Sequence, residues 1–152
     1  MQCLFICTGN YYRSRYAEIR FNALAAARGL AWRAESRGLR VDFEQKHNIG
    51  PLSPDAVARL TALALIDQPA ATRMPRALEP ADLEAAGRVI ALQRDEHYPM
   101  MVEAFPDWAE RVEYWDVHDR PPGEDYDPMQ DVEGKLDTLI GELSADPAGE
   151  CA

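Results

Sequence analysis

Cysteine is scarce in this chain, and long apolar runs are missing. Three cysteines occur in 152 residues. This small, odd number does not suggest a disulfide framework and fits a reducing compartment. No apolar stretch approaches the roughly 18 residues that suggest a membrane-spanning helix, and the short apolar start lacks the basic leader of a signal peptide. We therefore expect a cytoplasmic protein that has no membrane partner.

Positive charge is also in short supply. Acidic residues outnumber lysine and arginine by 26 to 16, which gives a formal net charge of −10. The negative field of such a chain repels nucleic acid and anionic membranes, so we expect neither as a partner. A phosphate ligand would have to be drawn in by a local site.

The pattern of apolar residues predicts alternating strands and helices. We expect strands at 2–7, 31–36, 88–92 and 111–115, and helices at 14–28, from 53–54 to about 64, near 79–80, at 95–104 and from 127–128 to about 143. This alternation favours parallel pairing through right-handed crossovers. The expected fold is α/β, a three-layer α/β/α sandwich with a central parallel sheet of about four strands.

The length suits one domain with a single core, which we place over residues 1–143, with a flexible tail over 144–152. In open parallel sheets the ligand site lies at the carboxyl ends of the strands. The first predicted strand ends at Cys7, and this position is where we expect the chemistry.

A phosphate-binding loop is predicted between the first strand and the first helix. Its residues after the cysteine are Thr8, Gly9, Asn10, Tyr11, Tyr12, Arg13 and Ser14. A turn this tight can point successive N–H groups inward, and the helix that follows adds its positive end, so the loop suits an anion. The same field stabilises a thiolate at Cys7.

Individual residues of the loop match this chemistry. Arg13 offers a planar fork for two phosphate oxygens. Ser14 can donate its hydroxyl to the thiolate, and Asn10 can bond the neighbouring backbone and hold the shape of the loop. Tyr11 and Tyr12 are candidates for the pocket mouth, although a core position is the better interpretation for Tyr12.

The loop resembles the signature Cys-x-Gly-Asn-x-Cys-Arg-Ser-Pro of the low-molecular-weight protein tyrosine phosphatases. The resemblance continues at 35–38, 48–50, 53–54 and 88–92, and covers residues 1–143. It implies a phosphatase that forms a cysteinyl-phosphate on Cys7 and needs no cofactor. It also implies phosphorylated proteins or small aryl phosphates as substrates, with phosphate or other oxyanions as ligands of the loop. His47 falls near the place where the family has an aromatic wall, although a solvated loop histidine explains it as well.

The sequence departs from that signature in two loop positions and in the general acid. Tyr12 replaces the second cysteine, and Arg15 replaces the proline. Three aspartates compete for the role of acid: Asp116, Asp119 and Asp127. Asp127 precedes a proline, but a helix N-cap explains that pair, whereas the spacing of Asp119 resembles that of the family. We favour Asp119 and leave the other two open.

Two other functions have to be weighed. A phosphate-binding module with weak or no catalysis is suggested by Arg15 and by the uncertain acid. An arsenate reductase needs relay cysteines, and the sequence has none between Cys7 and Cys151. His97 and His118 have no partners at ligand spacing, so no metal site is expected.

Overall fold

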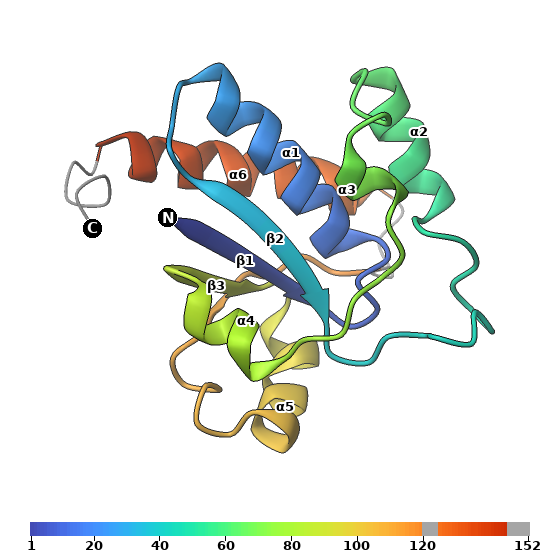
Figure 1. The fold of residues 1–152 in the computed structure, drawn as a ribbon, viewed down its shortest axis with the longest axis vertical. Coiled ribbons are helices and arrows are strands. Elements are labelled where there is room, and N and C mark those ends of the chain that lie inside the picture. Colours follow the sequence, from blue (N-terminus) through green and yellow to red (C-terminus); the bar gives the residue numbers. More distant parts are fainter. Residues whose placement is uncertain (120–124, 146–152) are drawn as a thin grey trace.

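The computed structural model describes residues 1–119 and 125–145 (Figure 1). Its strands are β1 (Gln2–Cys7), β2 (Arg33–Gly38), β3 (Arg88–Ala91) and β4 (Glu113–Tyr114). Its helices are α1 (Arg13–Ala27), α2 (Pro54–Ala62), α3 (Pro69–Thr72), α4 (Pro80–Ala85), α5 (Arg94–Ala104) and α6 (Pro128–Ala145). None of the helices in these two ranges is long and apolar enough to cross a bilayer.

The four strands form one parallel sheet in the order β2-β1-β3-β4, which confirms the predicted fold class. The chain leaves β1 to form β2 on one side, and later adds β3 on the other side. The carboxyl end of β1 therefore lies where the strand order reverses, the usual ligand position in open α/β sheets. Cys7 is the last residue of β1 and pairs in register with Gly38 of β2.

Helices cover both faces of the sheet, as Figure 1 shows. Along β1, Cys3 and Phe5 belong to a core cluster shared with α1 and α6, whereas Leu4 and Ile6 belong to a cluster shared with α4 and α5. This alternation follows the two-residue repeat of a strand whose two faces are both buried. The result is the predicted three-layer sandwich.

The helices α2 and α6, which flank the site, begin with side-chain caps where the sequence predicts their starts. Ser53 Oγ accepts a hydrogen bond from the backbone N–H of Ala56 at 3.2 Å, at the start of α2. Asp127 Oδ1 accepts one from Met129 N–H at 3.0 Å, at the start of α6. Both caps satisfy N–H groups that the first turn of a helix leaves unpaired.

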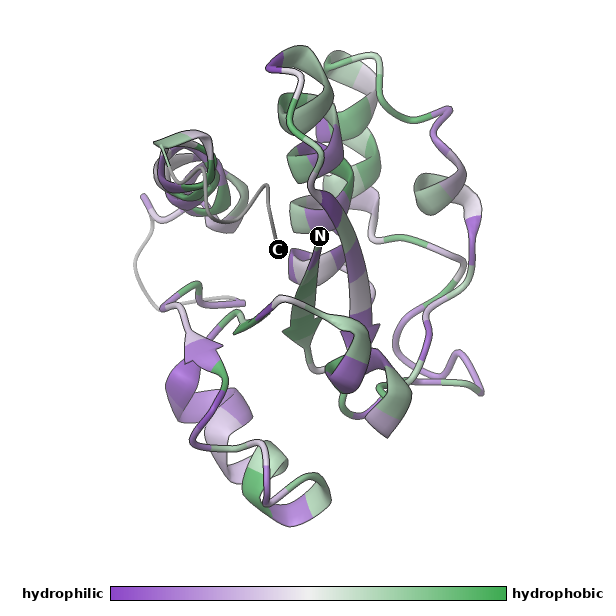
Figure 2. Cartoon of the chain, turned by 60° about the vertical axis from the view of Figure 1, so that its left-hand side comes forward, coloured by the Kyte–Doolittle hydropathy of each residue, from purple (hydrophilic) through white to green (hydrophobic). Residues whose placement is uncertain are grey.

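Three elements differ most clearly from the prediction. β2 begins two residues later than expected, because its sequence is polar and its register is set by pairing with β1. Figure 2 shows the contrast between hydrophobic β1 and hydrophilic β2. The last strand is shorter than predicted, at Glu113–Tyr114, and α3 has no predicted counterpart.

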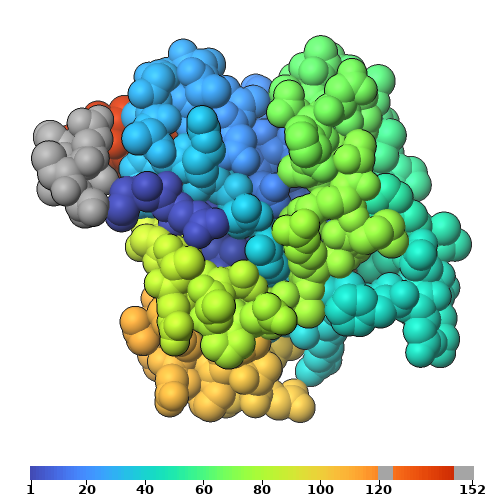
Figure 3. Space-filling model, viewed as in Figure 1, coloured from blue at the N-terminus to red at the C-terminus, as the bar shows by residue number. Residues whose placement is uncertain are grey.

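The segment 39–52 has no regular secondary structure and lies at one edge of the molecule near α2 (Figure 3). At the other end of the chain, α6 continues two residues past 143, to Ala145. Cys151 and the rest of the predicted tail lie outside the described residues. The domain boundary at 143 therefore stays a prediction.

Candidate active site

Cys7 lies at the bottom of the first loop, with 3% of its surface exposed. Its Sγ is 3.0 Å from Ser14 Oγ. Asn10 Nδ2 in turn donates to Ser14 Oγ at 2.9 Å. Because the Ser14 oxygen already accepts this bond, its own hydrogen is available for the cysteine sulfur. The arrangement suits a thiolate, which needs a donor and not an acceptor beside it.

Asn10 holds the shape of the loop. Its backbone has a φ of 51°, in the left-handed region that asparagine tolerates better than most residues. Its amide also donates to Ser36 Oγ at 2.9 Å, and its Oδ1 accepts from Arg73 Nη1 and from the backbone N–H of Arg76, both at 3.0 Å. All polar atoms of this fully buried side chain thus have partners.

The end of β2 packs directly against the loop. A Cβ on Gly38 would lie 2.9 Å from both the Asn10 nitrogen and the Thr8 oxygen, so only glycine fits without a shift of the backbone. The next two residues pair with the loop backbone, since Leu39 N–H donates to Cys7 O at 2.9 Å and Arg40 N–H donates to Thr8 O at 2.8 Å.

Arg13 begins α1 and is almost fully buried beside the loop. Its two terminal nitrogens bind the carboxylate of Glu96 at 3.1 and 2.9 Å, and Nη1 also donates to Val117 O at 3.1 Å. These contacts occupy the outer end of the guanidinium. The edge formed by Nε and Nη2 keeps N–H groups for an oxyanion.

Glu96 is the centre of a polar cluster that is not among the residues predicted from the sequence. In addition to the hydrogen bonds from Arg13, its carboxylate accepts one from Thr8 Oγ1 and lies 3.2 Å from His97 Nε2. Burial opposes its ionisation, but the hydrogen bonds of His97, Arg13 and Thr8 and the charge of Arg13 prevail. The pKa of Glu96 is therefore well below its ordinary value, so the group is an anion at neutral pH.

The signal for Glu96 was its position in the first turn of the helix after β3, at the same sheet edge as the loop. His97 follows it and is fully buried. Its Nδ1 accepts from the Gln93 backbone N–H at 3.0 Å, which places the ring proton on Nε2, near Thr8 Oγ1 and Glu96. Within 1–119 and 125–145, no three His, Cys, Asp or Glu side chains are grouped to hold a metal.

The three candidate acids have different surroundings. Asp119 Oδ1 lies 3.8 Å from Arg13 Nε, and the Asp119 side chain is 58% exposed. Asp116 is 76% exposed and pairs with His118 Nε2 at 3.2 Å. Asp127 caps α6 and forms an ion pair with Arg59. Of the three, Asp119 is the one paired with a loop residue.

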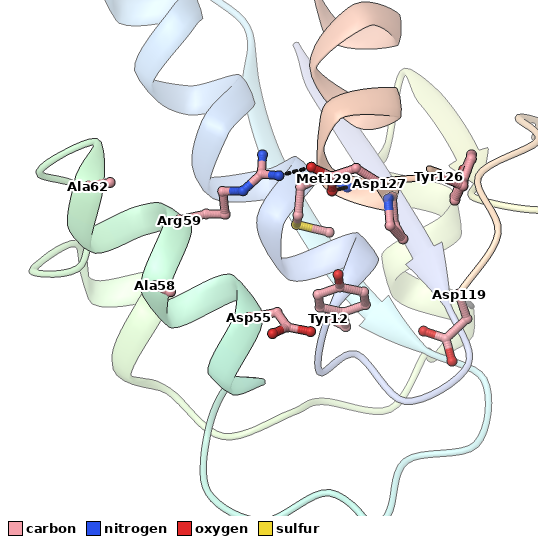
Figure 4. Close-up of a pocket in the computed structure, with 10 residues that line it drawn as sticks. Tyr12, Asp55, Ala58, Arg59, Ala62, Asp119, Tyr126, Asp127 and Met129 are labelled. Carbon is pink, nitrogen blue, oxygen red and sulfur yellow. Dashed lines mark hydrogen bonds and ion pairs between the residues drawn. The ribbon is translucent and has the colours of Figure 1, made fainter. Parts of the chain in front are cut away.

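Two cavities meet at the mouth of the loop. One, of about 590 Å³, is lined by residues from the loop, from 47–49, from the start of α2 and by Asp119; they include Tyr11, Tyr12 and His47. The other, of about 610 Å³, lies between α2 and the start of α6. Figure 4 shows this second cavity, with Tyr12 between Asp55 and Asp119 and with Arg59 bonded to Asp127. Tyr12, Asp55 and Asp119 line both cavities.

The two loop tyrosines differ in their contacts. Tyr11 donates its hydroxyl to Ile49 O at 2.8 Å, and its own carbonyl accepts from Ser53 N–H at 3.0 Å, so it joins the loop to the segment before α2. Tyr12 packs against the larger core cluster while it also lines both cavities. Its position thus combines the two roles that the sequence left open.

The chain matches the family model of low molecular weight phosphotyrosine protein phosphatases over residues 2–147. Among solved structures, a low molecular weight protein tyrosine phosphatase from T. tengcongensis is 29% identical, with a TM-score of 0.68 over 94% of this chain and 97% of that one. No protein with a curated function matches the sequence.

Two arginine phosphatases share the fold. The YwlE arginine phosphatase from Geobacillus stearothermophilus is 25% identical, with a TM-score of 0.65 over 98% of this chain and 94% of that one. A YwlE arginine phosphatase mutant with a phosphorylated active-site serine is 23% identical, with a TM-score of 0.77 over 96% and 97% of the two chains.

Proposed function

Because the chain belongs to the low molecular weight phosphotyrosine protein phosphatase family, we propose that Cys7 is its nucleophile, Arg13 its phosphate clamp and Asp119 its general acid. Members of this family are cysteine-dependent enzymes that act on phosphorylated substrates. This protein is such an enzyme. One observation supports the three assignments: Cys7 Sγ lies 3.0 Å from Ser14 Oγ in the loop, and Arg13 of the same loop pairs with Asp119 at 3.8 Å.

The proposed reaction has two steps. The Cys7 thiolate attacks phosphorus, the S–P bond forms as the P–O bond breaks, and Asp119 gives its proton to the leaving oxygen. Water then attacks the cysteinyl-phosphate, Asp119 takes a proton from that water, and the S–P bond breaks. Ser14 donates to the departing sulfur, and Arg13 binds the phosphoryl oxygens in both steps.

The remaining loop residues have supporting roles in this proposal. The backbone of Thr8, Gly9, Tyr11 and Tyr12 supplies N–H groups to the phosphoryl oxygens, and Asn10 fixes their direction.

We propose an aryl phosphate, such as phosphotyrosine in a protein, as the substrate. Its support is the cavity at the mouth, where Tyr11, Tyr12 and His47 offer faces on which an aromatic ring can stack. Phosphoarginine is a second candidate, because Asp55 and Asp119 line the same cavity and their carboxylates suit a guanidinium.

Composition supports our proposals about the cellular compartment and about the partners that the protein does not bind. The scarcity of cysteine supports a cytoplasmic setting, and the net charge of −10 argues against nucleic acid and anionic membranes as partners. We propose no cofactor for the reaction, since the two steps need only side chains and water.

Turnover of para-nitrophenyl phosphate tests the nucleophile. Cys7→Ser should abolish turnover, because a serine hydroxyl is not ionised near neutral pH and nothing beside it is placed to deprotonate it. Cys3→Ser is the matched control, a second buried cysteine on the same strand, and should leave turnover close to that of the wild type. Turnover by Cys7→Ser near the wild-type rate would rule out the mechanism.

The same assay separates an enzyme from a binding module. Para-nitrophenol is a good leaving group that tolerates a poor acid, so an enzyme with an imperfect acid still turns it over. Phosphate binding with no turnover by the wild type would favour the module. Comparison of phosphotyrosine and phosphoarginine peptides then decides between the two substrate classes.

A further inference from the structure

Arg15 stands where the family signature has proline, and its side chain is fully buried behind the loop. Its two terminal nitrogens donate four hydrogen bonds to main-chain carbonyl oxygens, those of Asn10 at 3.2 Å, Pro51 at 2.7 Å, Ala70 at 2.5 Å and Arg73 at 2.6 Å. The side chain thereby ties the loop to the segments before α2 and around α3.

All four partners of Arg15 are neutral. None of the ion pairs within 1–119 and 125–145 includes it, and its Nε has no hydrogen-bond partner there. Burial, followed by the like charge of Arg73, lowers the pKa of Arg15 to about 10. The side chain is therefore still a cation at neutral pH. A buried cation without a paired anion is costly, so a reason for it is needed.

The loop lies directly in front of this charge. Arg15 holds the carbonyl of Asn10 toward itself, and a loop that binds an anion through its N–H groups needs its carbonyls turned away from the anion. The side-chain amide of Asn10 donates a hydrogen bond to Ser14 Oγ, which lies 3.0 Å from Cys7 Sγ. An ionised Cys7 favours the protonated form of Arg15, so the two groups are within electrostatic reach.

We propose that Arg15 is a positioning residue for the reaction, which fixes the Asn10 carbonyl outside the anion site and supplies a buried positive charge whose anionic partners are the Cys7 thiolate and the phosphoryl group. This inference rests on the proposed role of Cys7. The proposal assigns a function to Arg15, the residue that departs most in size and charge from the family signature. It also explains why this cation has no carboxylate of its own.

Other charges also act on the two groups. Arg13 faces Cys7, and Glu96 and Asp119 face Arg13. Behind the loop, Arg73 and Arg76 add to the positive charge around Arg15, whereas Glu18 opposes it. Glu18 Oε1 accepts from Ser36 Oγ at 2.6 Å and from Arg73 Nη2 at 2.9 Å. Removal of the Glu18 charge should therefore act on Cys7 in the opposite direction to removal of the Arg15 charge.

The test is the pH dependence of Cys7 alkylation by iodoacetamide, followed by peptide mass. Arg15→Met keeps the bulk and loses the charge, and should move the midpoint upward by about one pH unit. It should also weaken the protection of Cys7 by inorganic phosphate by about tenfold. Arg15→Lys keeps the charge and should recover most of the midpoint shift. Arg28→Met, at the exposed far end of α1, is the control and should change neither value.

A merely structural role gives a different result. Arg15→Met would then lower resistance to urea and leave the alkylation midpoint in place. That result overturns the proposal, and so does a midpoint that Arg15→Met raises but Arg15→Lys does not restore. If Arg15→Met does not fold, Arg15→Gln decides, because it also loses the charge but keeps N–H groups for the carbonyl oxygens; an unchanged midpoint in this variant overturns the proposal. Turnover by the wild type is measured separately. An inactive wild type contradicts the phosphatase function, whereas the midpoints test Arg15 whether or not the protein turns over.

Discussion

Asp119 Oδ1 and Arg13 Nε lie 3.8 Å apart, with the arginine buried and the aspartate largely exposed. The pair connects Asp119, which lines both cavities at the mouth of the loop, with Arg13 of the loop itself. A phosphoryl group held by Arg13 would bring its leaving oxygen toward this carboxylate. The exposure of Asp119 leaves its side chain room to reach that oxygen, which is what a general acid needs.

Asp119→Asn should reduce turnover of phosphotyrosine by roughly 10²–10⁴-fold, the usual worth of general acid catalysis. The loss should shrink for leaving groups of low pKa, such as para-nitrophenol, because they depart without a proton. Steady-state rates across a series of aryl phosphates measure this dependence.

Two matched variants make the assignment of the acid specific. Asp116→Asn removes a carboxylate that pairs with His118, and should have little effect on the leaving-group dependence. Asp127→Asn alters the cap of α6 and its ion pair with Arg59, so it should lower stability more than turnover. Equal losses across leaving groups in Asp119→Asn, or a larger loss in Asp116→Asn, would identify a different acid.

Local sequence was enough to predict the loop, because the residues that give it its chemistry are close together in the sequence. Cys7, Asn10, Arg13 and Ser14 lie within eight positions, and the flanking strand and helix follow from apolar spacing. The parallel sheet follows from the alternation of strands and helices. Boundaries were less well predicted where pairing decides them, as in β2, whose polar residues take their register from β1.

The supporting residues could not be read from sequence, because they come from distant segments. Glu96 reaches Arg13 across 83 positions, and Arg73 reaches Asn10 across 63. Glu96 stands in the first turn of a predicted helix and Arg73 lies between two predicted helices, and ordinary surface charges take both positions. The fold brings them to the loop, so their roles become visible only once β3 and α3 are in place.

Replacement of Arg13 by lysine should be a severe change, although it keeps the charge. Lysine has no planar fork, so it cannot hold Glu96 through two nitrogens and at the same time offer a second edge to phosphate. Turnover should fall by roughly 10²-fold or more. Phosphate should also inhibit Arg13→Lys less well than the wild type. Wild-type inhibition and turnover in Arg13→Lys would mean that the bidentate clamp is not the role of this residue.

Glu96→Gln should make the free energy of unfolding less dependent on pH in the acidic range. The pKa of Glu96 is depressed in the folded protein, so its carboxylate stabilises the fold above its unfolded pKa of about 4.3. This contribution is lost as the pH falls from there toward the folded pKa. Urea midpoints at pH 7 and pH 3 should therefore show a wild type that is more stable than Glu96→Gln at pH 7, with a smaller difference at pH 3. A constant difference would assign no stabilising role to the Glu96 charge.

Cys7 should be vulnerable to irreversible oxidation, because the loop position that has a second cysteine in the family is Tyr12. Peroxide first converts a thiolate to sulfenic acid, which a neighbouring thiol can capture as a disulfide before it reaches sulfinic acid. Cys3 is a poor substitute. It lies four residues back along β1, roughly 13 Å away at about 3.3 Å per residue. Burial also raises the pKa of Cys3 to about 12, so it is protonated at neutral pH.

We therefore expect moderate peroxide to take Cys7 to sulfinic acid, with activity only partly restored by dithiothreitol. Phosphate in the loop should protect it. Tyr12→Cys supplies the missing thiol, and should form a disulfide with Cys7 and regain activity on reduction. Intact and peptide masses identify the oxidised species in both proteins. A disulfide between Cys7 and Cys3 or Cys151 in the wild type, with full recovery, would contradict this prediction, because a redox partner would then exist without a second cysteine in the loop.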